Sequence, residues 1–277
     1  SSLVTGVQTC ALPISENLLS KKDNSKAITF ISENGYKEKR TWKQLNINSN
    51  KIISFLKSNN IKSGDRVAAY LPNIIETVEY FIGTSAIGAI WSSCSPDFGV
   101  KGVIERFAQI KPKILVIADR YYYNGKEINV IERLPEILKK IKSIKRVVVL
   151  SYPGKKLTKF KKIKGIKYFY SKDIKNIKET SHILKKFNFN HPLAILYSSG
   201  TTGKPKCICH RTGGVLLQHL KEHQLHCEIK PGDNIFYFTT CGWMMWNWLV
   251  SSLASKASIL LFDGFPMYKK NDLLLKV

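Results

Sequence analysis

The sequence predicts an α/β fold of layered parallel sheets with flanking helices. Short apolar runs of strand length alternate with helical patterns from about Thr41 onward. These runs are apolar on both faces, which is typical of parallel strands covered by helices on both sides. They span residues 67–71, 89–92, 114–118 and 147–150.

Two helices can be placed between these strands. Thr41-Trp42-Lys43-Gln44 predicts a capping-box start, in which the threonine hydroxyl and the glutamine side chain accept hydrogen bonds from free backbone amides. The apolar residues that follow share one helical face: Trp42, Leu45, Ile52 and Leu56. A second helix is predicted from Pro72-Asn73, and its inner face is Ile75, Val78, Phe81 and Ile82.

The net charge of +24 is the strongest compositional feature. Only seven of the 44 basic residues are arginine, the residue that nucleic-acid readers favour for phosphate and guanine. A solvated lysine surface is therefore favoured over a nucleic-acid site. No apolar run approaches the roughly 20 residues that cross a bilayer, so no membrane partner is expected.

Residues 153–190 interrupt the alternation of strands and helices with a lysine-rich stretch. Its lysines are interleaved with Phe160, Tyr168, Phe169 and Tyr170, a mixture that can bind single-stranded nucleic acid. A solvated connector between subdomains is the favoured interpretation, because charge runs usually remain in water.

Six cysteines form no regular framework, which favours a reducing, cytoplasmic setting. Cys207 and Cys209 lack a second ligand pair at zinc-finger spacing, so they are interpreted as small buried hydrophobes. His219, His223 and His226 fall on one helical pattern. No carboxylate completes a ligand set with them, so solvent-facing histidines are expected and no metal site is predicted.

The most specific segment is a strand, 193–197, followed by a loop rich in glycine and hydroxyl side chains. Glycines let a backbone approach phosphate oxygens, and consecutive amides form an anion-binding nest. Lys206 adds a positive charge for the end of a triphosphate. The spacing is not that of a Walker A loop. The phosphate-binding residues predicted here are Ser198, Ser199, Gly200, Thr201, Thr202, Gly203 and Lys206.

The stretch from Tyr197 to Lys206 resembles the phosphate loop of the adenylate-forming superfamily, which includes acyl-CoA synthetases, luciferases and peptide-synthetase adenylation domains. Residues 40–45, 62–73 and 241–248 resemble its other motifs, and the resemblance covers nearly all of 15–277. It implies an acid–thiol ligase that uses ATP, Mg²⁺ and CoA. A carboxylate would attack the α-phosphate of ATP, and the CoA thiol would then take the acyl group.

The resemblance also implies roles for side chains outside the loop. Trp243, Met244 and Met245 would form the acyl pocket, although such a cluster is equally typical of ordinary core. Lys126 matches a position where related synthetases carry a basic residue directed toward the phosphates of CoA. The alternative is that Lys126 is an ordinary surface lysine. His210 lies just past the loop, where a structural role is favoured over a contact with substrate.

Gly-Trp-Met-Met-Trp-Asn-Trp at 242–248 resembles the acetoacetate-activating branch of the superfamily; acetate-activating relatives typically carry Val-Thr in place of the two methionines. The expected partners are thus the small molecules acetoacetate, ATP and CoA. A synthetase for acetate, propionate or hydroxybutyrate is the alternative, and a basic nucleic-acid-binding protein is a remote one. The oligomeric state is left open.

Neither end of the chain is expected to be a native terminus of the protein. Residues 1–14 resemble translated sequencing-adaptor read-through, which is not native protein sequence. Residues 15–190 are predicted to be a first subdomain, and residues 191–277 are predicted to begin a second, truncated subdomain. The superfamily's glutamate for Mg²⁺, its ribose-binding aspartate and its mobile domain with the catalytic lysine would follow Val277. No catalytic residue is therefore predicted within the chain, and the fragment is expected to be inactive alone.

Overall fold

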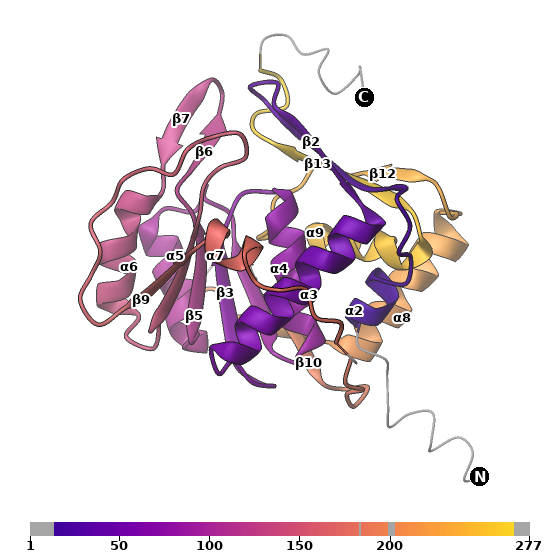
Figure 1. Cartoon of the computed structure of the whole chain (residues 1–277), viewed down its shortest axis with the longest axis horizontal. Coiled ribbons are helices and arrows are strands. Elements are labelled where there is room, and N and C mark those ends of the chain that lie inside the picture. The colour runs from indigo at the N-terminus through magenta and orange to yellow at the C-terminus, as the bar shows by residue number, and fades with distance from the viewer. Residues whose placement is uncertain (1–13, 183, 199–202, 269–277) are drawn as a thin grey trace.

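Two main sheets, a separate two-stranded sheet and the helices packed on them form the structure, a computed structural model (Figure 1). It describes residues 14–182, 184–198 and 203–268. The helices are α2 (Ile14–Leu18), α3 (Trp42–Ser58), α4 (Ile75–Ala86), α5 (Val100–Ile110), α6 (Leu134–Lys140), α7 (Ser171–Lys175), α8 (Thr212–Lys221) and α9 (Met244–Ser251). The strands are β1 (Lys26–Ser32), β2 (Lys37–Thr41), β3 (Arg66–Tyr70), β4 (Ile90–Cys94), β5 (Ile114–Ala118), β6 (Arg120–Tyr123), β7 (Lys126–Asn129), β8 (Arg146–Leu150), β9 (Lys167–Tyr170), β10 (Pro192–Tyr197), β11 (Cys207–Arg211), β12 (Asn234–Phe236) and β13 (Ser258–Asp263).

The larger sheet has seven strands in the order β11-β10-β4-β3-β5-β8-β9. All neighbouring pairs are parallel except β10 and β11, which are antiparallel. The four apolar runs recognised in the sequence correspond to β3, β4, β5 and β8, and each is almost wholly buried. The predicted α/β class with parallel strands is confirmed.

Helices cover both faces of this sheet, with α3 and α4 on one side and α5 and α6 on the other (Figure 1). The capping box of α3 is confirmed: Gln44 N–H donates to Thr41 Oγ1 at 3.2 Å, and Thr41 N–H donates to Gln44 Oε1 at 2.9 Å. The inner faces predicted for both helices are buried. This burial is what holds such helices on a sheet, because propensity alone contributes little.

Helix α4 begins at Ile75, three residues later than Pro72-Asn73 predicted. Ile74 has extended φ and ψ, and the Pro72 carbonyl accepts a hydrogen bond from the Thr77 hydroxyl at 2.7 Å, so the segment before Ile75 is a turn. Further along, α4 packs closely on α3. A Cβ added at Gly83 would lie 2.5 Å from Cγ2 of Ile52.

The second sheet has the order β12-β13-β1-β2 and joins distant parts of the chain. Strand β1 is parallel to β13, with Ile28 opposite Ile259, and antiparallel to β2. Both sheets contain strands from either side of residue 190, so the predicted subdomains do not correspond to separate sheets. The division at 190 remains a prediction.

The segment 153–190 holds more regular structure than a connector, since it contributes β9 and α7. Strand β9 pairs with β8 at the sheet edge, and its Phe169 packs on Phe55 of α3 with ring centroids 4.9 Å apart. The lysines dominated the sequence pattern, but the three consecutive aromatic residues 168–170 suit a strand. Of residues 1–14, only Ile14 is described; it begins α2 and is buried.

Candidate functional site

The predicted phosphate loop connects β10 to β11, and two hydrogen bonds join its first residue to its last. Ser198 N–H donates to the Lys206 carbonyl at 3.0 Å, and Lys206 N–H donates to Ser198 Oγ at 3.1 Å. Gly203 lies between them, and its neighbourhood is open: no atom lies within 4 Å of where a Cβ would be. Four of the predicted residues, Ser199, Gly200, Thr201 and Thr202, lie outside the described residues.

Helix α5 holds the base of this loop. Gln109 Nε2–H donates to the Pro205 carbonyl at 2.9 Å, and its Oε1 lies 3.6 Å from Cys207 Sγ. The guanidinium of Arg106 stands 5.8 Å from the ring centroid of Tyr197, the last residue of β10. The loop is thus attached to a helix on one side of the sheet as well as to two strands.

Two adjacent serines of β4 link the loop strand to the aromatic motif. Ser92 Oγ–H donates to the Ile195 carbonyl of β10 at 2.9 Å, and the same hydroxyl lies 2.9 Å from the Tyr197 hydroxyl. Ser93 Oγ–H donates to the Cys241 carbonyl at 2.5 Å. Because the carboxyl ends of neighbouring parallel strands lie at one edge of a sheet, the loop and the motif meet there.

Within the aromatic motif the residues separate into core and surface. Trp246 is buried and stacks on Trp91 of β4, with centroids 6.4 Å apart. Trp243 and Met244 are 55% and 45% exposed, and Met245 is half-buried. The two exposed side chains are therefore not core, and they are accessible beside the end of β4. Their assignment to an acyl pocket remains a prediction.

Asn73, which was predicted from the sequence only as part of a helix start, positions this motif. Its side-chain oxygen accepts a hydrogen bond from the Trp246 indole N–H at 2.9 Å, and its amide donates to the Thr239 carbonyl at 3.2 Å. The side chain is buried in the turn between β3 and α4. Its place directly after a buried strand and a proline was the available signal, since polar groups at strand ends often organise a site.

A cavity of about 270 Å³ lies next to the motif, between Thr239, Tyr123, Asp97 and Asp263. Asp263 accepts a hydrogen bond from the Tyr152 hydroxyl at 2.8 Å. Burial raises the pKa of this carboxyl to about 7, although the Tyr152 hydrogen bond opposes the rise. Asp263 was missed by motif-based reasoning because it belongs to no contiguous pattern of titratable residues.

Lys126 lies at the tip of the hairpin formed by β6 and β7, where it is exposed. The hairpin is held by Glu33, whose carboxylate accepts the backbone N–H groups of Asn124 at 2.9 Å and Gly125 at 2.8 Å. The same carboxylate accepts the Phe265 N–H at 2.7 Å, next to the cavity. The hairpin tip is therefore placed near the cavity, and a role of Lys126 toward CoA remains a prediction.

Two of the three histidines after the loop are buried, so the expectation of solvent-facing side chains was wrong for them. His219 Nδ1 lies 2.7 Å from Ser251 Oγ, and His223 Nε2 lies 3.1 Å from the Trp248 carbonyl oxygen. Burial lowers the pKa of each imidazole to about 4. The helical period placed both on one face, and helix α9 covers that face. His226 is exposed as expected.

Two further expectations concern residues of β11. Cys207 and Cys209 are exposed, not buried, because β11 is the last described strand at its edge of the sheet. His210 is half-buried, and desolvation lowers its pKa. Among the residues that the structure describes, no group of three or more metal-ligating side chains is found. In the same part of the chain, no helix is long and apolar enough to cross a membrane.

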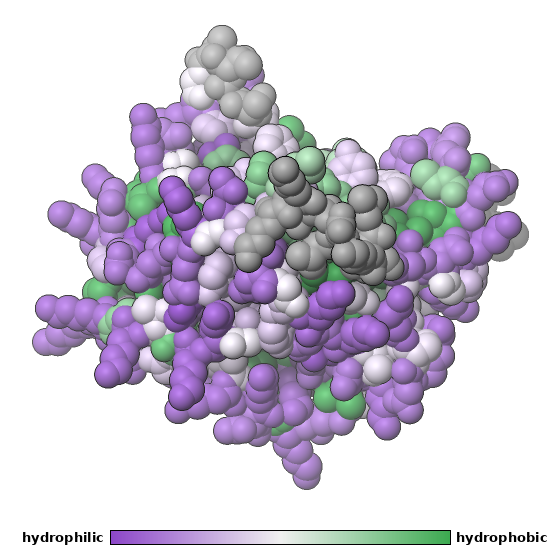
Figure 2. Space-filling model, turned by 90° about the horizontal axis from the view of Figure 1, so that it is seen from above, coloured by the Kyte–Doolittle hydropathy of each residue, from purple (hydrophilic) through white to green (hydrophobic). Residues whose placement is uncertain are grey.

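Some lysines of the lysine-rich segment lie close to aromatic rings of the same segment. Lys162 already places its ammonium 5.9 Å from the Tyr168 ring and 5.4 Å from the Tyr170 ring, and Lys167 lies 5.0 Å from the Phe169 ring. Other hydrophilic side chains project into solvent over much of the surface (Figure 2). This agrees with a solvated lysine surface.

Comparison with known proteins gives the same family throughout. The family model described as AMP-binding enzyme matches residues 17–277. An acetoacetyl-coenzyme A synthetase of Rhizobium meliloti is 42% identical over 263 residues, which are 95% of this chain and 40% of the relative. The acetoacetyl-CoA synthetase of Gallus gallus is also 42% identical with the same coverage, and a malonamoyl-CoA synthetase of Penicillium aethiopicum is 37% identical.

A solved structure supports the fold as well. The acetoacetyl-CoA synthetase from Streptomyces lividans matches with a TM-score of 0.85 and 34% identity, over 93% of this chain and 39% of that one. The chain thus spans about 40% of the length of the relatives that it matches. None of these comparisons favours a nucleic-acid-binding protein.

Proposed function

Since this chain belongs to the family of AMP-binding enzymes, we propose that it forms part of an AMP-forming acid–thiol ligase that activates acetoacetate. One observation carries the proposal: Ser92 and Ser93 of β4 hold the phosphate-loop strand and the aromatic motif at one sheet edge. A triphosphate on the loop and an acid beside Trp243 would then be neighbours. The names of the relatives support acetoacetate as the acid.

In the first step, a carboxylate oxygen attacks the α-phosphorus of ATP and pyrophosphate leaves, which forms the acyl-adenylate. Negative charge develops on phosphate oxygens, so the amides and hydroxyls of the loop and the charge of Lys206 act by positioning and electrostatics. In the second step, the sulfur of CoA attacks the acyl carbon and AMP leaves. We place CoA toward the hairpin of Lys126 and the cavity beside Asp263.

Mg²⁺ is proposed only as the ion that accompanies the phosphates of ATP. The described residues offer no group of three metal-ligating side chains, so no residue of the chain is assigned to it. The proposal includes a cytoplasmic setting, as the cysteines predict.

The test is acid-dependent exchange between ATP and pyrophosphate. Residues 15–277 would replace the matching region of the Rhizobium meliloti relative, and the unaltered relative would serve as the positive control. Exchange should be faster with acetoacetate than with acetate or 3-hydroxybutyrate. Exchange driven by another acid would retain the reaction and reject acetoacetate. A folded chimera that is inactive with every acid would contradict the proposed function.

Substrate choice provides a sharper prediction. The double substitution Met244→Val with Met245→Thr should shift the ratio of kcat/KM for acetoacetate over acetate by roughly tenfold or more toward acetate, because one methylene in a pocket is worth about 1–3 kcal/mol. Met267→Val, which alters another exposed methionine outside the motif, is the matched control. An unchanged ratio in both variants would remove these methionines from the acyl pocket.

A further inference from the structure

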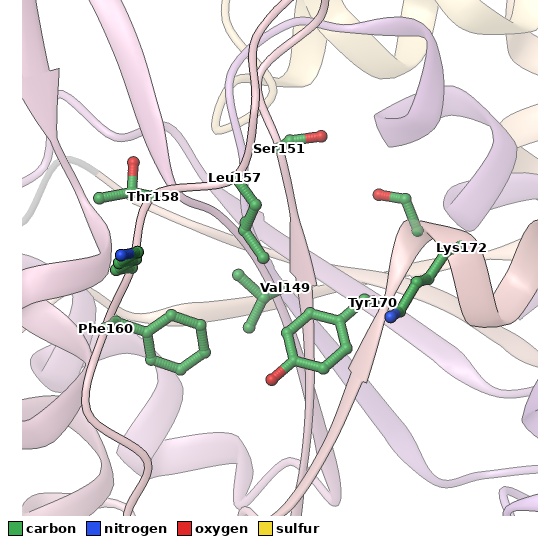
Figure 3. A pocket seen from close by; sticks show the side chains of 9 residues that line it. Val149, Ser151, Leu157, Thr158, Phe160, Tyr170 and Lys172 are labelled. Carbon is green, nitrogen blue, oxygen red and sulfur yellow. The ribbon is translucent and has the colours of Figure 1, made fainter.

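A cavity of about 750 Å³ opens at the sheet edge opposite the phosphate loop (Figure 3). It lies at the carboxyl ends of β8 and β9, whereas the loop joins β10 to β11 at the other edge. The volume is within the usual range for sites that bind small molecules. Crevices at the carboxyl ends of parallel strands are also where open α/β sheets bind ligands.

Two aromatic rings and an aliphatic side chain form the apolar part of this cavity. Val149 and Tyr170 are opposite each other in the ladder of β8 and β9, and Phe160 comes from the segment that connects these two strands. In Figure 3 the rings of Phe160 and Tyr170 lie on either side of Val149. Both rings are half-buried, so each retains an accessible part.

The cavity exists because this face of β9 is only partly covered. Side chains alternate along a strand, and Phe169 is directed to the α3 side, where it packs on Phe55. Tyr168 and Tyr170 therefore face the other way. Phe160 packs on Tyr168, with centroids 5.7 Å apart, and leaves the area beside Tyr170 open.

The rim of the cavity is positively charged. Lys159 and Lys172 line it, and the ammonium of Lys162 stands 5.4 Å from the centroid of the Tyr170 ring. The sequence from residue 155 to 172 contains no acidic residue. The nearby carboxylates are engaged: Asp119 pairs with Arg120 at 3.1 Å, and Asp173 accepts the Tyr170 N–H at 2.8 Å. An anion is the complementary ligand.

We propose that this cavity binds a nucleoside monophosphate. The base would lie against Phe160 and Tyr170, because stacking on aromatic rings suits any base. The phosphate would be held by Lys159 and Lys172, whose ammonium groups act as point charges for phosphate. The hydroxyls of Ser151 and Ser171, which also line the cavity, are within the part that the sugar would occupy.

The experiment uses Tyr170→Trp as a local fluorescent reporter in the 277-residue chain, since no native tryptophan lines this cavity. The variant is titrated with AMP, adenosine, inorganic phosphate and decanoate, and the signal of the wild-type protein is subtracted. AMP should change the fluorescence with saturation, and adenosine and phosphate should bind at least about tenfold more weakly. No AMP-dependent signal would overturn the proposal, and tighter binding of decanoate would identify a fatty-acid site instead.

Charge reversal tests the phosphate contacts in the same reporter protein. Lys159→Glu and Lys172→Glu should each weaken AMP binding by about fivefold, the upper range for an exposed ion pair. Lys164→Glu alters the same segment outside the cavity and should have little effect. Lys206→Ala changes the phosphate loop and should leave this signal unchanged, which separates the cavity from the proposed ligase site. Equal losses in all four variants would contradict a defined site.

Discussion

Asp263 is a buried carboxyl group whose ionisation makes the folded state less stable. It lines the cavity beside the aromatic motif and accepts hydrogen bonds from the Tyr152 hydroxyl, at 2.8 Å, and from the Asn73 backbone N–H. Burial raises its pKa to about 7, whereas the unfolded chain ionises near 3.8. Between these values the folded state binds a proton that the unfolded state lacks, so its contribution to stability is lost as pH rises from about 4 to 7.

Asp263→Asn should remove this contribution while keeping a side chain of the same shape. The melting temperature of the variant should fall more steeply than that of the wild type when pH is lowered from 6.5 to 5, because the stabilising protonation is gone. Thermal unfolding followed by circular dichroism measures this. Asp173→Asn, at an exposed carboxylate, is the control. Parallel curves for Asp263→Asn and wild type would show that Asp263 ionises normally.

At the scale of the element, α8 and the π-helical turn that follows it, Glu222–His226, are attached to α9 by histidine side chains. The His223 ring packs against Trp248 with centroids 4.6 Å apart, and its Nε2 lies 3.1 Å from the Trp248 carbonyl oxygen. His219 is paired with Ser251. Because α9 carries the aromatic motif, these contacts help to set where that motif lies.

His219 and His223 should make the protein less stable in acid. Their folded pKa values of about 4 lie below the ordinary 6.5, so between these values the unfolded state binds protons that the folded state does not. His223→Gln, whose amide can still donate to the Trp248 carbonyl, should reduce the loss of melting temperature between pH 6.5 and 5. His226→Gln, at an exposed position, should not. The opposite ranking would contradict the burial of His223.

The contact between α3 and α4 depends on a glycine. Gly83→Ala would place a Cβ 2.5 Å from Ile52, so the substitution should destabilise the protein by about 1–3 kcal/mol despite the better helix propensity of alanine. Gly214→Ala in α8, where nothing lies within 4 Å, should stabilise by about 0.5–1 kcal/mol. Chemical denaturation measures both. A stabilised Gly83→Ala variant would show that the helices are farther apart.

At the scale of the whole molecule, the two halves of the chain are interleaved. Strands β10 and β13 come from the second part of the chain, and each pairs with a strand from the first part, β4 and β1. The stacked rings of Trp91 and Trp246 join the same two parts, with Phe81 at the edge of both. Parts that share sheets and core lose their stability together.

Unfolding should therefore be a single cooperative transition. Far-ultraviolet circular dichroism and tryptophan fluorescence should give the same midpoint in denaturant. Trp246→Phe, which removes the hydrogen bond to Asn73 and part of the stack, should lower that midpoint equally by both probes. Trp243→Phe, at a side chain that is 55% exposed, is the matched control. Separate midpoints would indicate two independently stable subdomains, as the division at residue 190 predicted.

Buried carboxyl groups and buried histidines have opposite effects on how the stability of the protein depends on pH. Burial raises the pKa of Glu79, beside Arg40 in the contact between β2 and α4, to about 7, as it does for Asp263. These two carboxyls favour the folded state as pH falls toward 4, while His219 and His223 oppose it. Buried groups therefore act in both directions over nearly the same pH interval, and their contributions to the pH dependence of stability partly offset each other.

The sequence by itself determined the buried parallel strands and the two helices α3 and α4, and it predicts the chemistry of the loop. The capping box at Thr41, the buried strands and the inner helix faces follow from local periods and hydrogen-bond patterns, which an element carries in its own residues. The glycines and hydroxyls from Ser198 to Lys206 likewise indicate a phosphate site without reference to the rest of the chain.

Only the tertiary structure shows which helix or strand packs on which face of another element. A helical period shows that His219 and His223 share a face, but not that α9 packs on it. The cysteine spacing led to the interpretation of Cys207 as a buried residue, but the pairing of β11 at the sheet edge leaves it exposed. The link from Ser92 and Ser93 to two distant segments, and the cavity beside Tyr170, arise from pairing between residues far apart in the chain. Such pairing is set by the packing of whole faces, which no local pattern encodes.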